Sequence, residues 1–156
     1  MKITVVAIGK KHDPKLLAAI EEYSRRLTHY TDFSWKLCEA KITNSMQEQQ
    51  IRSAESEVIS HTLSPQDTVV LLDERGTALS SPRLAQKIET YRTSAAKSVV
   101  FIIGGAYGVT DELQARADFV WSLSPLVFPH QLVRLILAEQ LYRAHTILAG
   151  EQYHHQ

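Results

Sequence analysis

The sequence is poor in cysteine, in long apolar runs and in net charge. Cys38 is the single cysteine among 156 residues, which leaves no internal disulfide and no cysteine-based zinc site and points to a reducing compartment. No apolar run approaches the roughly 18 residues that a membrane span requires. Seventeen lysines and arginines balance 17 aspartates and glutamates, which excludes a protein that grips nucleic acid by bulk charge alone.

The composition is otherwise that of an ordinary globular protein. Hydrophobic residues make up 44% and charged residues 22%, which excludes disordered and fibrous classes. The length favours a single domain over residues 1–156, and no repeat or low-complexity linker divides it. The start, Met1-Lys2 followed by a short β-branched run and Gly9-Lys10, is unlike a signal peptide. We therefore expect a cytoplasmic protein that does not enter the membrane.

Strand-like and helix-like segments alternate along the whole chain. Strands are expected at residues 3–8, 33–38, 68–72, 98–103 and 119–121, where apolar and β-branched residues cluster. Helices are expected from an Asp13 N-cap with Pro14 to Leu27, over 44–61, from Ser81-Pro82, over 110–117 and over 131–148. Residues 73–76 are expected to form a turn. This alternation predicts an α/β fold, a mainly parallel sheet with helices on both faces.

In such sheets ligands bind beyond the carboxyl ends of the strands. Three segments fall there: Leu72-Asp73, Gly104-Gly105 and the stretch Ser122–His130. The sequence therefore predicts a site where these three segments meet.

The segment Gly104-Gly105-Ala106-Tyr107-Gly108 follows a buried strand and precedes a helix. Glycines at this place either form a tight turn or let backbone N–H groups approach a ligand, and the pattern leaves both open. The spacing G-G-x-x-G is neither a dinucleotide fingerprint nor a Walker A loop. A phosphate cradle is disfavoured, and a small nucleoside-like ligand remains open.

The stretch Ser122–His130 is apolar but contains Pro125 and Pro129, so it forms neither a regular helix nor a central strand. If it is buried, its N–H and C=O groups need partners. The edge of a bound adenine would supply them. A core-filling connection, capped by Pro129 at the start of the last helix, fits the pattern slightly better.

The last helix and the tail carry the remaining groups with chemistry. Arg134 and Arg143 interrupt an apolar helix, and Tyr153-His154 follows it. Charges on a helix usually form a solvated face, but aromatics stack on bases, arginine holds phosphates, and histidine or tyrosine transfers protons. His154-His155 lacks the i,i+4 spacing of helix-borne zinc ligands, so no metal is expected.

Several segments together resemble one known family. They are 1–10 (MKITVVAIGK), 22–27 (EYSRRL), 101–108 (FIIGGAYG), 121–124 (WSLS), 128–134 (FPHQLVR), 139–144 (EQLYRA) and 153–154 (YH). In order and spacing they resemble the bacterial pseudouridine N3-methyltransferases of large-subunit ribosomal RNA, the minimal SPOUT type that uses S-adenosylmethionine. The resemblance covers essentially the whole chain.

The resemblance implies a C-terminal trefoil knot and a homodimer with its active site at the interface. It also implies contacts to S-adenosylmethionine, with backbone amides that bind the adenine. The residues implied in these contacts are Leu72, Gly104, Gly105, Gly108, Leu123, Ser124, Pro125, Leu126, Val127 and Phe128.

The implied reaction is methyl transfer to N3 of a pseudouridine in 23S rRNA. The ring nitrogen must lose a proton, so a base or a cation that stabilises the anion is expected nearby. We assign proton handling to His154, phosphate or uracil-anion contacts to Arg134 and Arg143, and stacking or positioning to Tyr153.

Two other functions stay open at this point, a SPOUT methyltransferase acting on tRNA and a non-catalytic ribosome-associated module with the same fold. The net charge of zero bears on the RNA substrate, because few phosphate contacts mean weak binding to naked RNA. We therefore expect the assembled ribosome to be preferred over free 23S rRNA.

Overall fold

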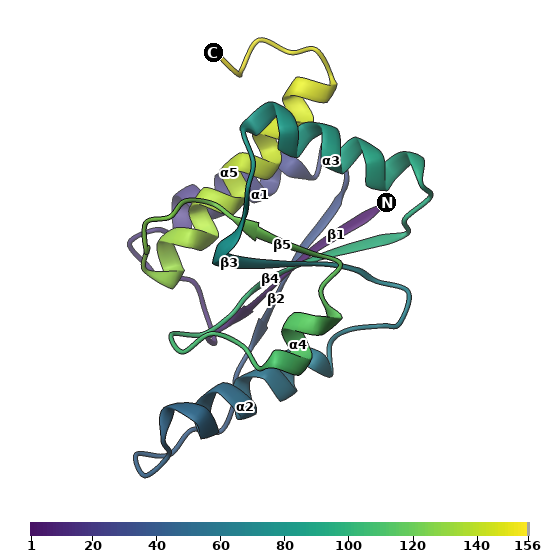
Figure 1. Cartoon of the computed structure of the whole chain (residues 1–156). Helices are drawn as coiled ribbons and strands as arrows, with labels where there is room; N and C mark the ends of the chain where they lie inside the picture. The colour runs from purple at the N-terminus through teal and green to yellow at the C-terminus, as the bar shows by residue number, and fades with distance from the viewer. Residues whose placement is uncertain (156) are drawn as a thin grey trace.

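A sheet of five parallel strands forms the centre of the computed structural model, which describes residues 1–155 (Figure 1). The order across the sheet is β2-β1-β4-β3-β5. The strands span Lys2–Ile8 (β1), Asp32–Cys38 (β2), Thr68–Ala78 (β3), Ser98–Ile103 (β4) and Phe119–Ser122 (β5). The parallel sheet expected from the alternating pattern is confirmed.

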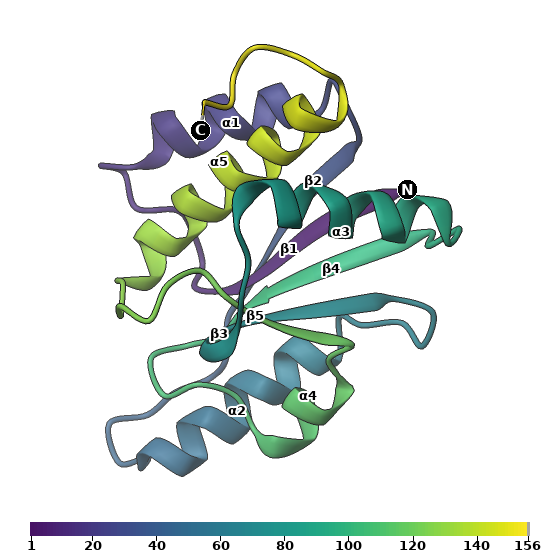
Figure 2. The same ribbon diagram turned by 45° about the horizontal axis from the view of Figure 1, so that its top comes forward.

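Helices cover both faces of the sheet, as expected (Figures 1 and 2). They are α1 (Leu17–Leu27), α3 (Ser81–Thr93) and α5 (His130–Leu148) on one face, and α2 (Glu48–Ser60) and α4 (Asp111–Arg116) on the other. Among the described residues no helix is long and apolar enough to cross a bilayer.

The central strands are buried on both faces, which explains their nearly continuous apolar sequences. Val5 and Phe101, which are register partners on β1 and β4, point into the layer under α1, α3 and α5. Their neighbours Val6 and Ile102 point into the layer under α2 and α4. Successive side chains alternate between the faces of a strand, so the two halves of each apolar run fill two separate cores.

The first helix begins later than its sequence indicates. The structure starts α1 at Leu17, whereas Asp13 was the expected N-cap. Asp13 instead closes a tight turn: its Oδ1 accepts from the Lys15 N–H at 2.8 Å, and its carbonyl accepts from the Leu16 N–H at 2.9 Å. The Asp-Pro pair therefore shapes the β1–α1 loop, because a side-chain-to-backbone turn is an alternative to a helix start for aspartate.

The turn expected at residues 73–76 is also wrong, because β3 continues to Ala78. Leu72 and Thr77 both pair with Trp121 on β5, so the residues between them bulge out of the ladder. The Asp73 carboxylate accepts from the Arg75 N–H at 2.8 Å within this bulge. A bulge of this kind makes the same local bend that turn-forming residues indicate, without ending the strand.

Candidate functional site

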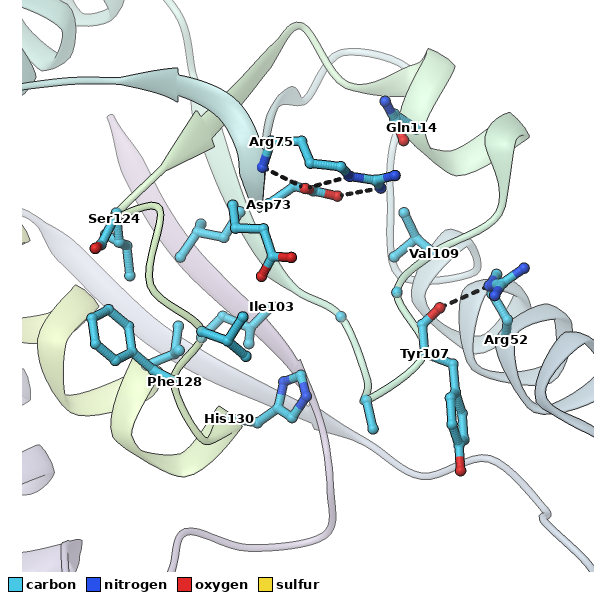
Figure 3. Close-up of a pocket in the computed structure, with 18 of the residues that line it drawn as sticks. Arg52, Asp73, Arg75, Ile103, Tyr107, Val109, Gln114, Ser124, Phe128 and His130 are labelled. Carbon is cyan, nitrogen blue, oxygen red and sulfur yellow. Dashed lines mark hydrogen bonds and ion pairs between the residues drawn. The ribbon is translucent and has the colours of Figure 1, made fainter.

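A cavity of about 610 Å³ opens beside the bulge of β3 and the carboxyl ends of β4 and β5 (Figure 3). Its walls come from residues 72–75 of β3, from residues 103–109 after β4, and from residues 123–130 between β5 and α5. Glu48 and Arg52 of α2 complete the rim. The cavity thus lies at the meeting point of the three segments that the sequence indicates.

Most of the expected donor-binding residues line this cavity. Those that do are Leu72, Gly104, Gly108, Leu123, Ser124, Leu126, Val127 and Phe128. Gly105 and Pro125 are absent from the wall, since Gly105 faces α2 and Pro125 lies between two lining residues. The structure therefore brings together eight of the ten residues in the cavity wall. Gly105 lies behind this wall, where it packs against α2.

The glycine turn is fastened to α2 at two backbone points. The Arg52 Nε–H donates to the Tyr107 carbonyl at 2.7 Å (Figure 3). The Thr110 N–H donates to the Ser56 hydroxyl at 2.9 Å. Within the turn, the Gly108 N–H donates to the Gly105 carbonyl at 3.1 Å. The sequence of α2 is typical of an exposed helix, yet this helix supports the site.

Gly105 packs against a buried carboxyl group. A Cβ at Gly105 would run into the Glu55 carboxyl group, so a larger residue there would have to displace this side chain. Glu55 is 8% exposed, and its Oε1 has no hydrogen-bond partner within residues 1–155. Burial raises the pKa of the Glu55 carboxyl. The sequence carries no signal for this residue, because it sits in a polar helix among other acids.

The loop after β5 is fastened at one end and open at its middle. The Ser122 hydroxyl donates to the Ser124 carbonyl at 3.1 Å, and the Leu126 N–H donates to the Ser124 Oγ at 3.0 Å. Leu126 and Val127 are 68% and 77% exposed. The expectation of a buried loop is therefore wrong for these two side chains in a single chain, because no other segment of the described chain covers them.

Acidic side chains dominate the charge around the cavity. Asp73 forms an ion pair with Arg75 at 2.9 Å, and the hydrogen bond from Arg75 lowers the pKa of the Asp73 carboxyl. Glu48, Glu74 and Asp111 also line the wall and form no ion pair within the described part of the chain. The wall thus favours a ligand that carries positive charge.

A second cluster of polar side chains lies at the end of α5. The Arg143 Nε–H donates to Glu139 Oε1 at 2.9 Å, and the Tyr153 hydroxyl donates to the same oxygen at 3.1 Å. The Arg143 guanidinium stacks over the Tyr153 ring at 4.7 Å. Nδ1 of His154 lies 3.3 Å from Nη1 of Arg143. The structure therefore brings together three of the four expected catalytic residues.

The protonation of this cluster follows from its contacts. Burial and the hydrogen bond with Tyr23 raise the pKa of Tyr153, and the hydrogen bond to Glu139 raises the pKa of Arg143. Tyr153 is thus a neutral hydrogen-bond donor and Arg143 a permanent cation at neutral pH. Since Arg143 only donates, Nδ1 of His154 accepts and the ring hydrogen of the neutral tautomer sits on Nε2. This Nε2 is buried and has no partner in the described chain.

Arg134 does not belong to either cluster. It is 0% exposed, and its guanidinium donates to the carbonyls of Ile8 at 2.8 Å and Lys11 at 3.0 Å. This burial contradicts the expectation that Arg134 contacts phosphate or the uracil anion directly. A guanidinium enclosed by backbone carbonyls reaches neither the cavity nor solvent, so its role is to hold the β1–α1 loop.

The cavity and the tail cluster lie at opposite ends of α5. Val133 lines the cavity and Arg143 follows ten residues later, which at a rise of 1.5 Å per residue is roughly 15 Å along the helix axis. Figure 1 likewise places the C-terminal tail at the far end of α5 from the loop that precedes this helix. Within one chain the two halves of the site do not meet.

Comparison with known proteins assigns the family. The family described as "Predicted SPOUT methyltransferase" matches residues 1–154. The chain belongs to the SPOUT methyltransferase family. SPOUT methyltransferases use S-adenosylmethionine, and the family implies the trefoil knot expected from the resemblance.

Individual relatives agree with the SPOUT assignment. Three proteins named "Ribosomal RNA large subunit methyltransferase H" come from Geobacter metallireducens, Christiangramia forsetii and Acetivibrio thermocellus. They are 44%, 43% and 42% identical to this chain, and each alignment covers 99–100% of both proteins. The similarity therefore extends through both the cavity and the tail cluster.

Proposed function

We propose that this chain transfers a methyl group from S-adenosylmethionine to N3 of a pseudouridine in 23S rRNA, as a homodimer and on the assembled ribosome. The observation that carries the proposal is the cavity of about 610 Å³, formed by the glycine turn and residues 123–130 at the carboxyl edge of the sheet. The names of the full-length relatives support ribosomal RNA of the large subunit as the substrate.

The residues of the cavity fit S-adenosylmethionine. The volume is in the range of pockets for ligands of this size, and Leu72, Ile103 and Phe128 offer apolar surface for an adenine ring. Glu74 and Asp111 face the same space without ion-pair partners in the described chain, which suits the positive charges of the donor. When bound, the donor supplies a methyl group already activated by the sulfonium. The chain then has to place the acceptor nitrogen in line with that methyl group.

The tail cluster has the groups that the acceptor base requires. The N3 proton leaves to solvent water, and the anion that remains is spread over the uracil ring, where Arg143 is a cation placed to stabilise it. His154 offers its Nε2–H to a uracil oxygen, in the tautomer that its contact with Arg143 imposes. Tyr153 remains protonated and positions the base by stacking or by a hydrogen bond. These roles refine our expectation for His154, which becomes a hydrogen-bond donor to the anion.

A homodimer joins the two halves of the site. Because the cavity and the tail cluster of one chain lie at opposite ends of α5, the tail that completes a cavity has to come from a second copy. The exposed side chains of Leu126 and Val127 beside the cavity give such a copy apolar surface to cover.

The experiment that tests this function combines donor binding with methyl transfer. S-adenosylmethionine at about 100 times its dissociation constant should stabilise the protein by roughly 2.7 kcal/mol. With radiolabelled donor, ribosomes that lack the modification should gain label in 23S rRNA, and faster than protein-free 23S rRNA does. Absence of both stabilisation and label would favour a non-catalytic module. Label in tRNA and not in 23S rRNA would show that tRNA is the substrate.

A further inference from the structure

Arg134 is a buried cation without a carboxylate partner. Its side chain is fully buried on α5, and no Asp or Glu oxygen of the described chain lies within 4.0 Å of its nitrogens. Its Nε also lacks a hydrogen-bond partner there. Burying a charge in this way is costly, so the contacts that Arg134 does make identify what it holds in place.

Those contacts all fall on the loop between β1 and α1. The guanidinium donates to the carbonyls of Ile8 and Lys11, and it lies against Nδ1 of His12 at 3.2 Å. Gly9 has a φ of +123°, and a Cβ there would lie 2.8 Å from Nη2 of Arg134. Glycine is thus required at this position both by its backbone conformation and by the approach of the guanidinium.

Gln131, one turn earlier on α5, fixes the next part of the same loop. Its Oε1 accepts from the Asp13 N–H at 2.9 Å, and its Nε2–H donates to the Lys11 carbonyl at 3.4 Å. The loop from Gly9 to Lys15 therefore has its backbone fastened by two side chains of α5. A loop held in this way loses little conformational entropy when it binds a partner.

The fastened loop presents lysines to solvent. Lys10, Lys11 and Lys15 are exposed, and none of them forms an ion pair within residues 1–155. The single acid of the segment, Asp13, is engaged by the Lys15 N–H. The buried charge of Arg134 lies behind these lysines, where water screens it less than a surface charge. The segment is a local positive surface on a chain with no net charge.

This surface lies beside the cavity. Ala7 of β1 is the register partner of Ile103, so the loop that follows β1 starts next to the glycine turn that follows β4. Gln131 is the neighbour of His130, which lines the cavity and points into it in Figure 3. An RNA whose base enters the cavity would therefore pass its backbone close to the lysines.

We propose that the segment Gly9–Lys15 binds the phosphate backbone of ribosomal RNA beside the cavity, and that Arg134 is the positioning residue that fixes this segment. The inference rests on the proposed function and names a part of its RNA-binding surface. Lysines act on phosphates as point charges, and each contact releases counterions, so binding through this segment is salt-dependent.

The test compares two double variants of equal charge change. Lys10→Gln/Lys11→Gln alters the proposed surface, and Lys2→Gln/Lys97→Gln alters exposed lysines at the amino edge of the sheet. Binding to ribosomes is measured by co-sedimentation over a range of salt concentrations. At low salt the first variant should bind ribosomes roughly tenfold more weakly. The slope of log affinity against log salt concentration should be smaller in magnitude by about 2, and the affinity for S-adenosylmethionine should be unchanged. Equal losses in both variants, or none in the first, would overturn the proposal.

Arg134→Lys tests the positioning role. A lysine keeps the charge but cannot reach both carbonyls with a rigid fork, so ribosome binding should weaken and amide exchange at Lys11–Asp13 should quicken, while kcat at saturating ribosomes changes little. A general loss of stability with normal ribosome binding would contradict it. Binding is measured without catalysis, so a protein that binds ribosomes through the lysines but transfers no methyl group would refute the proposed function alone.

Discussion

At the residue scale, the chemistry of the tail cluster depends on one contact, between Nη1 of Arg143 and Nδ1 of His154 at 3.3 Å. This contact assigns the two ring nitrogens different tasks, since the nitrogen that faces a guanidinium can only accept. The other nitrogen, Nε2, has no hydrogen-bond partner within the described chain, and in the proposed function a uracil oxygen accepts its hydrogen. His154 is therefore expected to donate a hydrogen bond to the uracil anion and not to abstract the proton.

Substitution of His154 separates these two roles. Glutamine keeps an N–H donor and loses the basic nitrogen, so His154→Gln should retain most of the single-turnover methylation rate, while His154→Ala should lose about tenfold to a hundredfold. Rates measured from pH 6 to 9 give the check. If both variants are equally inactive over this range, His154 is the base.

Glu55 gives a second prediction at this scale, on stability. Burial raises the pKa of its carboxyl above the ordinary 4.5, so the folded chain holds this proton at pH values where the unfolded chain has released it. The free energy of unfolding then falls as the pH rises from 4.5 through the raised pKa. Glu55→Gln removes this loss and should be more stable than wild type at pH 7.5, by about 1 kcal/mol or roughly 2–4 °C in Tm, but not at pH 4.

The control for this prediction lies on the same helix. Glu57 is exposed, so Glu57→Gln should leave the pH dependence of Tm unchanged. A Glu55→Gln variant whose Tm differs from wild type by the same amount at pH 4 and pH 7.5 would contradict the protonation argument.

At the residue scale, the sequence does not reveal which ionisable side chains are buried. The glycine turn and the loop before α5 were predictable, because glycine and proline constrain the backbone locally and strand ends locate the site. The burial of Glu55 beside Gly105, and of Arg134 beside Gly9, depends on segments far apart in the chain. Arg134 was therefore expected in direct contact with RNA, and Glu55 was not among the expected site residues.

At the scale of elements, α2 acts as a support for the glycine turn. It contributes the Ser56 hydroxyl, which accepts from the Thr110 N–H at 2.9 Å, and Thr110 in turn caps α4 through the Leu113 N–H at 3.3 Å. One side chain of α2 thus fixes both the end of the turn and the start of the following helix. The apolar spacing of α2 predicted the helix, but polar contacts of this kind leave no periodic pattern.

Removing the Ser56 hydroxyl should loosen the turn without touching the ligand. Ser56→Ala leaves the Thr110 N–H without an acceptor, which should cost roughly 1–3 kcal/mol in the free energy of unfolding and raise the dissociation constant for S-adenosylmethionine several-fold. Isothermal titration and denaturant unfolding measure the two effects. Ser53→Ala, an exposed change on the same helix, should alter neither value. An unchanged dissociation constant for S-adenosylmethionine in Ser56→Ala would show that α2 does not support the site.

At the scale of the whole molecule, the proposed function needs a second chain to bring a tail cluster to each cavity. The cavity and the tail cluster are separated along α5. No periodicity in the sequence indicates this separation, or that a second chain would bridge it. The family resemblance is the source of the expected knot and of the proposed homodimer, because threading and assembly are not encoded in local patterns. Zero net charge is compatible with an RNA substrate because three exposed lysines, Lys10, Lys11 and Lys15, lie in one segment.

Mixing two inactive variants tests the shared site. Gly104→Leu fills the cavity and Arg143→Ala removes the cation of the tail, so each homodimer should be inactive. After unfolding and refolding together in equal amounts, half of the dimers combine both variants and contain one intact site. The mixture should therefore regain about a quarter of the wild-type activity. No recovery, with dimers confirmed by sedimentation, would place both halves of the site in one chain.

The most direct test of the central claim is mass-spectrometric mapping of 23S rRNA from cells that lack this protein. We expect one pseudouridine to lose its N3 methyl group in these cells and to regain it when the wild-type protein is added back. The Arg143→Ala variant should fail to restore it. An identical modification pattern with and without the protein would contradict the account.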